Sequence, residues 1–134
     1  GIGFVPYSPL NRGFLGGDLN EHSDFGSGND NRAGLPRFAP VNLRANGRFV
    51  AALHAFGQPR GMTPAQVALG WLLWKAPWVL PIPGTTKRAH LWENLGTLAF
   101  DLPDADWRAL EATVGAIPVQ GARYGASEQR QVQG

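Results

Sequence analysis

Residues 82–87 (Ile-Pro-Gly-Thr-Thr-Lys) combine several groups that suit phosphate binding, at a point where we predict a strand to end and a helix to begin. Gly84 allows a ligand to approach the backbone, and Thr85 and Thr86 carry hydroxyl donors. Lys87 adds a point charge, and a helix N-terminus adds free N–H groups and about half a positive charge. These groups favour a phosphate. An ordinary helix start, with a threonine N-cap and a solvated lysine, explains them as well.

A second segment with chemical potential follows residues 2–7, an apolar run that we predict to be a short buried strand. In parallel α/β architectures, ligands gather at the carboxyl ends of strands. Tyr7 would there be able to stack on a planar ring, and Ser8 to bond a phosphate or an amide. By spacing alone, an edge tyrosine that packs on its neighbours is the better interpretation.

Metal chemistry has little support in the sequence. His22, His54 and His90 are far apart and lack metal-ligand spacing. Residues 29–31 (Asn-Asp-Asn) resemble the start of a calcium loop, but the positions that follow do not supply the remaining ligands. We therefore expect no metal site.

Aromatic and acidic residues of the second half are given structural roles. We expect core packing for the tryptophans, because a base-stacking platform would need interleaved arginine and lysine; they are Trp71, Trp74, Trp78, Trp92 and Trp107. Three acids are predicted to form the solvated face of the last helix, with acids near its positive N-terminus; they are Asp104, Asp106 and Glu111.

The elements that must position these residues alternate between strand and helix. After the strand at 2–7, residues 8–41 have the composition of a long loop, which in a compact domain is usually functional or disordered. A helix is predicted from Pro40, ended by Gly57 and Pro59.

The second half begins with a strong helix start. Thr63 as N-cap, Pro64 at the first helical position and Gln66 for a capping box predict a helix that runs to about Lys75 and is largely buried. The remaining predictions are a strand at 78–82, a helix at 87–98, a last helix at 104–114, and a polar tail from residue 121 whose far end is mobile. This order indicates a parallel sheet covered by helices.

Composition excludes several classes of protein. The 134 residues are 43% hydrophobic and 16% charged, with a net charge of +2 and no cysteine. Disulfide scaffolds, thiol catalysis and cysteine-ligated zinc are therefore excluded. There is no block of five like charges, no apolar run approaching about 18 residues and no signal peptide, so we expect neither nucleic acid nor a membrane as partner, and a cytoplasmic location.

Two observations lead us to expect a piece of a longer protein. The chain opens on Gly1, and its one methionine is Met62. Two strands are also too few for a complete α/β fold, because a parallel pair buries neither of its faces alone.

Several segments together resemble the aldo-keto reductase family, in its bacterial and plant-type branch. Residues 7–15 are similar to the motif of strand seven and its loop, and residues 63–73 to the helix that follows. Residues 82–95 are similar to the cofactor motif of strand eight, and residues 121–124 to the carboxyl-terminal sequence of that branch. The resemblance covers nearly the whole chain in the right order.

The resemblance implies an α/β fold, the carboxyl-terminal portion of a TIM (β/α)8 barrel that binds NADPH at its carboxyl-terminal face. Residues 1–134 would be the last two βα units plus the terminal helix, incomplete on their own. Residues 11–41 would be a long cofactor and substrate loop that folds over NADPH, and residues 121–134 the tail. The exposed barrel interior would favour self-association and poor solubility of the chain alone.

By the same resemblance, residues of the first segment hold the nicotinamide half of NADPH. Tyr7 would stack on the nicotinamide ring and leave its other face open for hydride transfer. Ser8, Leu10 and Arg12 would line the path of the pyrophosphate.

Residues of the second segment would hold the adenosine half. The turn Gly84–Lys87 would bind the 2′-phosphate, and His90 occupies a position where many members carry a basic side chain for that phosphate. Glu93 and Asn94 would contact the adenine edge. A lysine, hydroxyls and a helix dipole at the 2′-phosphate favour NADPH over NADH.

The family's catalytic Asp, Tyr, Lys and His are expected outside this chain. Its tyrosines are Tyr7 and Tyr124, neither of which lies in a motif that matches the catalytic tyrosine, and its lysines are Lys75 and Lys87. We therefore expect the parent protein to reduce a small aldehyde or ketone, and this chain alone to be inactive. The alternative is a non-catalytic nucleotide-binding or regulatory module of the same fold, which an upstream Tyr–Lys pair would argue against.

Overall fold

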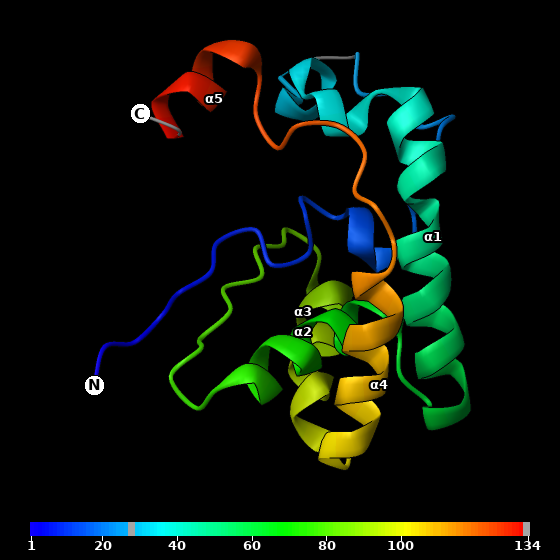
Figure 1. Ribbon diagram of the computed structural model, residues 1–134, viewed down its shortest axis with the longest axis vertical. Coiled ribbons are helices and arrows are strands. Elements are labelled where there is room, and N and C mark those ends of the chain that lie inside the picture. The colour runs from blue at the N-terminus through cyan, green and yellow to red at the C-terminus, as the bar shows by residue number, and fades with distance from the viewer. Residues whose placement is uncertain (27–28, 133–134) are drawn as a thin grey trace.

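The computed structural model describes residues 1–26 and 29–132, a largely helical molecule (Figure 1). Its α-helices are α1 (Pro40–Gly57), α2 (Pro64–Lys75), α3 (Arg88–Gly96), α4 (Asp104–Gly115) and α5 (Ala126–Val132). Short 3-10 turns are η1 (Phe14–Gly16), η2 (Asn31–Gly34), η3 (Pro36–Phe38), η4 (Gln58–Arg60) and η5 (Thr97–Ala99). The bounds predicted for α1, α2 and α4 are confirmed to within a residue. The predicted helix at 87–98 is divided into α3 and η5.

The two predicted strands are present as extended segments that run parallel, side by side (Figure 1). Isolated bridges join Phe4 to Val79 and Tyr7 to Ile82, so the prediction of continuous strands is wrong for the described residues. Phe4 N donates to the Trp78 carbonyl at 2.8 Å. Two residues further on, the equivalent donor would belong to Pro6, which has no N–H, and the ladder is interrupted there.

Helix α2 begins as its sequence predicts. The Thr63 hydroxyl accepts a hydrogen bond from Gln66 N at 3.2 Å, and Gln66 Oε1 accepts one from Thr63 N at 3.0 Å. Pro64 takes the first helical position, where its missing N–H costs nothing. The capping box is confirmed, and these three residues fix where the most buried helix starts.

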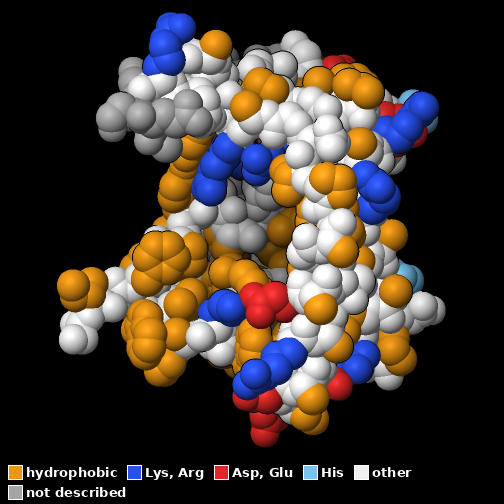
Figure 2. All heavy atoms as spheres, viewed as in Figure 1, with side chains coloured by type: hydrophobic (Ala, Val, Ile, Leu, Met, Phe, Trp, Pro, Cys, Tyr) orange, Lys and Arg blue, Asp and Glu red, His pale blue; other side chains and the backbone are white. Residues whose placement is uncertain are grey.

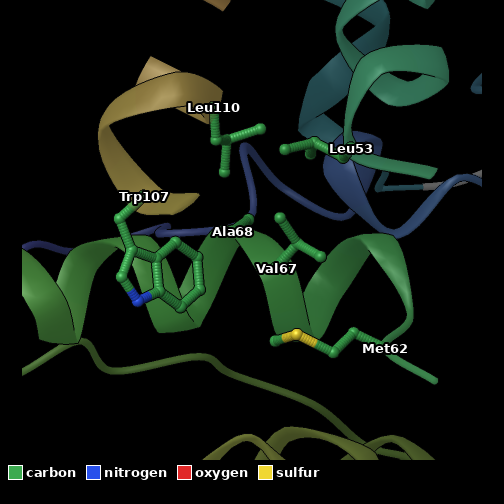
Figure 3. Close-up of a cluster of buried hydrophobic side chains, with 6 residues drawn as sticks. All are labelled: Leu53, Met62, Val67, Ala68, Trp107 and Leu110. Atoms are coloured by element: carbon green, nitrogen blue, oxygen red, sulfur yellow. The ribbon is translucent and has the colours of Figure 1, made fainter. Parts of the chain in front are cut away.

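The main hydrophobic core lies between α1, α2 and α4. Figure 3 shows its buried side chains converging from these helices and from the segment before α2; they are Leu53, Met62, Val67, Ala68, Trp107 and Leu110. Gly70 of α2 allows a close contact, because a Cβ there would lie 2.7 Å from the Trp107 ring. The large ring thus packs directly on the backbone of α2.

A second core folds the long loop onto α1. Its buried members are Phe14, Phe25, Leu35, Phe38 and Leu43, the last of which belongs to α1. Residues 27–28 of the loop predicted at 11–41 lie outside the described residues. The described parts of that loop are therefore anchored by apolar contacts rather than loose.

Two tryptophan predictions are wrong. Trp107 is buried and Trp71 and Trp74 are half-buried, but Trp78 and Trp92 are 57% and 60% exposed. They lie on the extended segment before α3 and on α3, and both are more than half exposed.

The predicted solvated face of α4 is confirmed for Asp104, whose side chain is 71% exposed, but all three acids also have partners. Asp106 pairs with Arg60 at 2.9 Å and Glu111 with Lys75 at 2.8 Å. Asp104 accepts from the Trp74 ring nitrogen at 2.8 Å. The acids therefore join α4 to α2 and to η4 instead of only facing water.

The tail predicted at 121–134 contains α5, which the polar composition did not indicate. Residues 133–134, part of the end predicted to be mobile, lie outside the described residues. Among the described helices, none has the length and apolar character that crossing a membrane requires.

Candidate functional site

A cleft of about 450 Å³ opens where the two extended segments end. It is formed by the turn after the first segment, the turn before α3, and one face of α3. Among its lining residues are eight of the eleven predicted cofactor residues: Ser8, Leu10, Arg12, Gly84, Thr85, His90, Glu93 and Asn94. Residues of the first predicted cofactor segment and of the second are thus brought to one cavity.

The first wall of the cleft is a turn with an unusual backbone. Ser8, Asn11 and Arg12 all adopt left-handed conformations, with φ of 50°, 49° and 55°. Such conformations are uncommon outside glycine, cost free energy, and cluster at ligand sites. Within the turn, Asn11 N donates to the Ser8 carbonyl at 2.9 Å. The strained turn faces the cleft with the Arg12 side chain among its lining groups.

This turn is held by an ion pair in the long loop. Arg32 Nη1 donates to the Arg12 carbonyl at 3.2 Å, and Arg32 Nη2 lies 2.6 Å from Asp30 Oδ2. The hydrogen bonds from Arg32 lower the pKa of Asp30 to about 2. The Asp30 side chain is 24% exposed, so water weakens this pair only in part. Asp30 is therefore engaged with Arg32, and the calcium-loop interpretation of residues 29–31 has no free carboxylate there.

The second wall is the turn that leads into α3. Lys87 is the N-cap residue, and no side chain of the described residues caps the helix. The Thr85 hydroxyl instead accepts a hydrogen bond from Lys87 N at 3.0 Å, so the expectation of a threonine N-cap is wrong. The first N–H groups of α3 consequently have no helical or side-chain acceptor in the described residues. An uncapped helix start of this kind attracts anions.

The remaining predicted residues lie beside the cleft and do not line it. Thr86 and Lys87 are exposed in the same turn as Thr85. Tyr7 is 50% exposed, and the Arg123 guanidinium lies 4.9 Å from the centre of its ring. The cofactor roles stay predictions for all eleven residues, and these three lie close to the cleft without lining it.

Sequence reasoning missed Asp18, which also lines the cleft. With Glu93 it adds two carboxylates to a cavity that Arg12 and His90 also line. No local signal marks Asp18, because its place depends on how the loop folds back onto α1. Among the described residues, no group of three or more His, Cys, Asp or Glu is arranged to hold a metal ion.

Comparison with known proteins decides the family. The family model described as "Aldo/keto reductase family" matches residues 1–114. The chain belongs to the aldo/keto reductase family. It is 41% identical over 125 residues to a probable aldo-keto reductase of Glycine max, and 37% identical over 123 residues to an aldo-keto reductase of Schizosaccharomyces pombe whose name specifies NADP(+).

Each of these matches covers 92% of this aldo/keto reductase chain but only 35% and 36% of the relatives. The chain thus spans about a third of the length of the curated relatives that it matches. The family resemblance predicted from its motifs is confirmed, and membership assigns the chain to a family of oxidoreductases whose fold is the TIM barrel.

Proposed function

We propose that this chain is the cofactor-binding, carboxyl-terminal portion of a reductase that uses NADPH to convert aldehydes or ketones to alcohols. In this proposal its two extended segments are strands seven and eight of a TIM barrel. The observation that carries the proposal is the convergence of eight predicted cofactor residues on one cleft. The Schizosaccharomyces pombe relative named for NADP(+) supports the choice of cofactor.

The chemistry of the cleft fits a dinucleotide phosphate. Arg12 supplies positive charge, and the His90 ring, the Thr85 hydroxyl and the Asn94 amide supply further polar groups. The uncapped amides at the start of α3 add donors for an anion. We assign Ser8, Leu10 and Arg12 to the pyrophosphate and the Gly84–Lys87 turn with His90 to the 2′-phosphate.

When bound, NADPH supplies the hydride that reduces the carbonyl carbon. The residues of this chain bind and orient it: Tyr7 provides a ring face beside the cleft, and Glu93 and Asn94 stand at the adenine end. No general acid is assigned here. In the described residues Lys75 pairs with Glu111, and both tyrosine rings lie near Arg123.

Binding and turnover test the proposal separately. Calorimetric titration of the protein with NADPH should show binding that Arg12→Gln and Asn94→Ala each weaken by about tenfold, the value of one or two lost polar contacts. Arg48→Gln is the matched control, because the exposed Arg48 guanidinium donates to the Ala45 carbonyl of its own helix and lines neither wall of the cleft. Equal binding by all four proteins would contradict the assigned site.

A non-catalytic nucleotide-binding module remains the second candidate. It rests on the same cleft, which accounts for nucleotide binding alone, whereas a reductase also needs a general acid. Turnover by the longest polypeptide that the gene encodes, together with no turnover by this chain, supports the reductase. NADPH binding without turnover by either supports the module.

A further inference from the structure

A second cavity, of about 220 Å³, adjoins the cofactor cleft. Ser8 and Pro9 line both cavities, so the strained turn is their common wall. Arg37 and Arg123 are the charged residues that line the second cavity, and no aspartate or glutamate is among its lining residues. The two cavities therefore differ in character, because the first contains acids as well as bases.

Arg37 is held in place by the fold. It lies in η3 and is half-buried, and its Nε donates to the Gly121 carbonyl at 3.3 Å. Burial and the nearby positive charge of Arg123 both lower its pKa. Neither guanidinium forms an ion pair with an acid among the described residues. Two neighbouring cations without a counter-charge repel each other, and an anion between them would remove that repulsion.

Arg123 is positioned from the other side by the segment that follows α4. Its guanidinium lies 4.9 Å from the centre of the Tyr7 ring and 5.6 Å from that of Tyr124. The segment is fastened to α1 by the buried Asn46, whose amide donates to the Gln120 carbonyl at 2.8 Å and accepts from Gln120 N at 2.9 Å. Arg37 is thus held by the fold, and the exposed Arg123 is placed at the same cavity by a segment that is fastened to α1.

We propose that Arg37 and Arg123 bind the carboxylate of a small organic acid. The proposal rests on the function proposed above, in which the neighbouring cleft holds NADPH, and it specifies that the carbonyl substrate carries the acid. The guanidinium fork matches a carboxylate in shape and charge. The cavity is smaller than the roughly 300–1,000 Å³ of drug-sized sites, and Phe14, Phe49 and Val119 supply apolar walls for a hydrocarbon part. Figure 2 shows lysine and arginine side chains gathered at the mouth of a hollow above α4, which is the kind of surface an anion would enter.

The test compares two substrates that differ in charge and little else, 4-carboxybenzaldehyde and its methyl ester, with the longest polypeptide that the gene encodes. NADPH oxidation gives kcat/KM for each. We expect the acid to be preferred, and the ratio of acid to ester to fall at least tenfold in Arg37→Gln and in Arg123→Gln. Arg37→Lys keeps the charge and should restore part of the ratio. Arg48→Gln, on the exposed side of α1, should leave it unchanged.

A second readout does not depend on turnover. Calorimetric titration with benzoate should show binding that both Gln variants weaken at least tenfold, while their circular dichroism spectra match that of the parent. If benzoate binding falls but the acid-to-ester ratio does not, the anion is a separate ligand bound beside the substrate, and the site itself is supported. If neither aldehyde is reduced, the proposed function fails, and the benzoate titration alone decides on this site. Unchanged benzoate binding in both variants overturns it.

Discussion

Lys87 occupies the N-cap position of α3, in the turn that forms one wall of the cleft. At the scale of single residues, this is the charge that would distinguish a 2′-phosphate from a 2′-hydroxyl. The other lysine, Lys75, is 2.8 Å from Glu111 and lies over the rings of Trp71 and Trp74. The two lysines of the chain therefore form a natural pair of test and control.

We expect Lys87→Met to weaken NADPH binding by about tenfold and to leave NADH binding nearly unchanged, because only NADPH carries the phosphate that the ammonium would meet. Calorimetric titration with each cofactor measures the difference. Lys75→Met should affect neither. A loss of both cofactors to the same degree would show that Lys87 acts on the helix start and not on the phosphate.

The ion pair of Asp30 with Arg32 makes the stability of the protein depend on pH. Its pKa is lowered from 3.8 to about 2 by the hydrogen bonds from Arg32, so the ionised form is favoured in the folded protein. The resulting stabilisation is complete above pH 3.8 and is lost as the pH falls toward 2. We expect Asp30→Asn to lower the free energy of unfolding, measured by urea denaturation at pH 7. The difference in this free energy between variant and parent should shrink between about pH 4 and pH 2.

A direct measurement follows the Asp30 carboxyl by NMR. Its midpoint should lie near 2 in the parent and move up toward 3.8 in Arg32→Gln. A midpoint that does not respond to Arg32 would mean that the pair does not hold the turn of the cofactor cleft.

At the scale of elements, α2 depends on close packing against α4. A Cβ at Gly70 would lie 2.7 Å from the Trp107 ring, whereas a Cβ at Gly47 of α1 would have nothing within 4 Å. We expect Gly70→Ala to lower the free energy of unfolding by about 1–3 kcal/mol through overpacking. Gly47→Ala should raise it by about 0.5–1 kcal/mol, because alanine favours the helix.

Urea denaturation of the two glycine variants measures this difference. Equal and small effects would indicate that Trp107 can move away from α2 at little cost. Changes of opposite sign in the free energy of unfolding would show that the Trp107 ring is fixed against α2. The ring then also fixes how α2 packs on α4.

The elements also show which parts of the fold the sequence can predict. The start of α2 rests on Thr63, Pro64 and Gln66, which are neighbours in sequence, so a local signal predicts it. The interruption of the ladder has a local cause as well, because a proline at position 6 argues against a continuous strand at residues 2–7. Helix α5 carries no apolar period, and nothing in the tail's composition indicates it.

The site was predictable where its residues lie in short family motifs and unpredictable where it depends on distant contacts. Eight residues predicted to bind the cofactor reach one cleft because each motif ends one extended segment or begins one helix. Arg37 and Gly121, which meet through a hydrogen bond, are 84 residues apart. No spacing rule connects such residues, so the second cavity emerges only from the folded chain.

At the scale of the whole molecule, the two extended segments and the outer side of α3 carry uncovered apolar side chains. Phe4 is 59% exposed, Leu80 56% and Ile82 54%. Figure 2 shows hydrophobic side chains gathered over these segments. Contiguous apolar surface of this kind is typical of an interface, and we propose that a protein surface covers it in the assembled protein.

We expect the 134-residue chain, expressed alone, to self-associate through this surface, with a sedimentation coefficient that rises with concentration. The double variant Phe4→Thr, Leu80→Thr should weaken association roughly tenfold or more, since two apolar side chains are no longer buried. Val41→Thr, 72% exposed on α1, is the matched control and should have no effect. A monomer with a sharp cooperative melt would contradict the prediction.

The two hydrogen bonds between Asn46 and Gln120 also make the opening of the carboxyl-terminal segment measurable by hydrogen exchange. The segment after α4 is fastened to α1 by this pair of hydrogen bonds and by the contact of Arg37 with Gly121. Such a segment opens by local unfolding while the helices stay intact. The Gln120 backbone amide then exchanges its hydrogen with solvent. Its exchange rate therefore measures how often the segment opens and releases Arg123 from Tyr7. A carboxylate bound between the Arg37 and Arg123 guanidiniums would lower the exchange rate of the Gln120 amide without any movement of a helix.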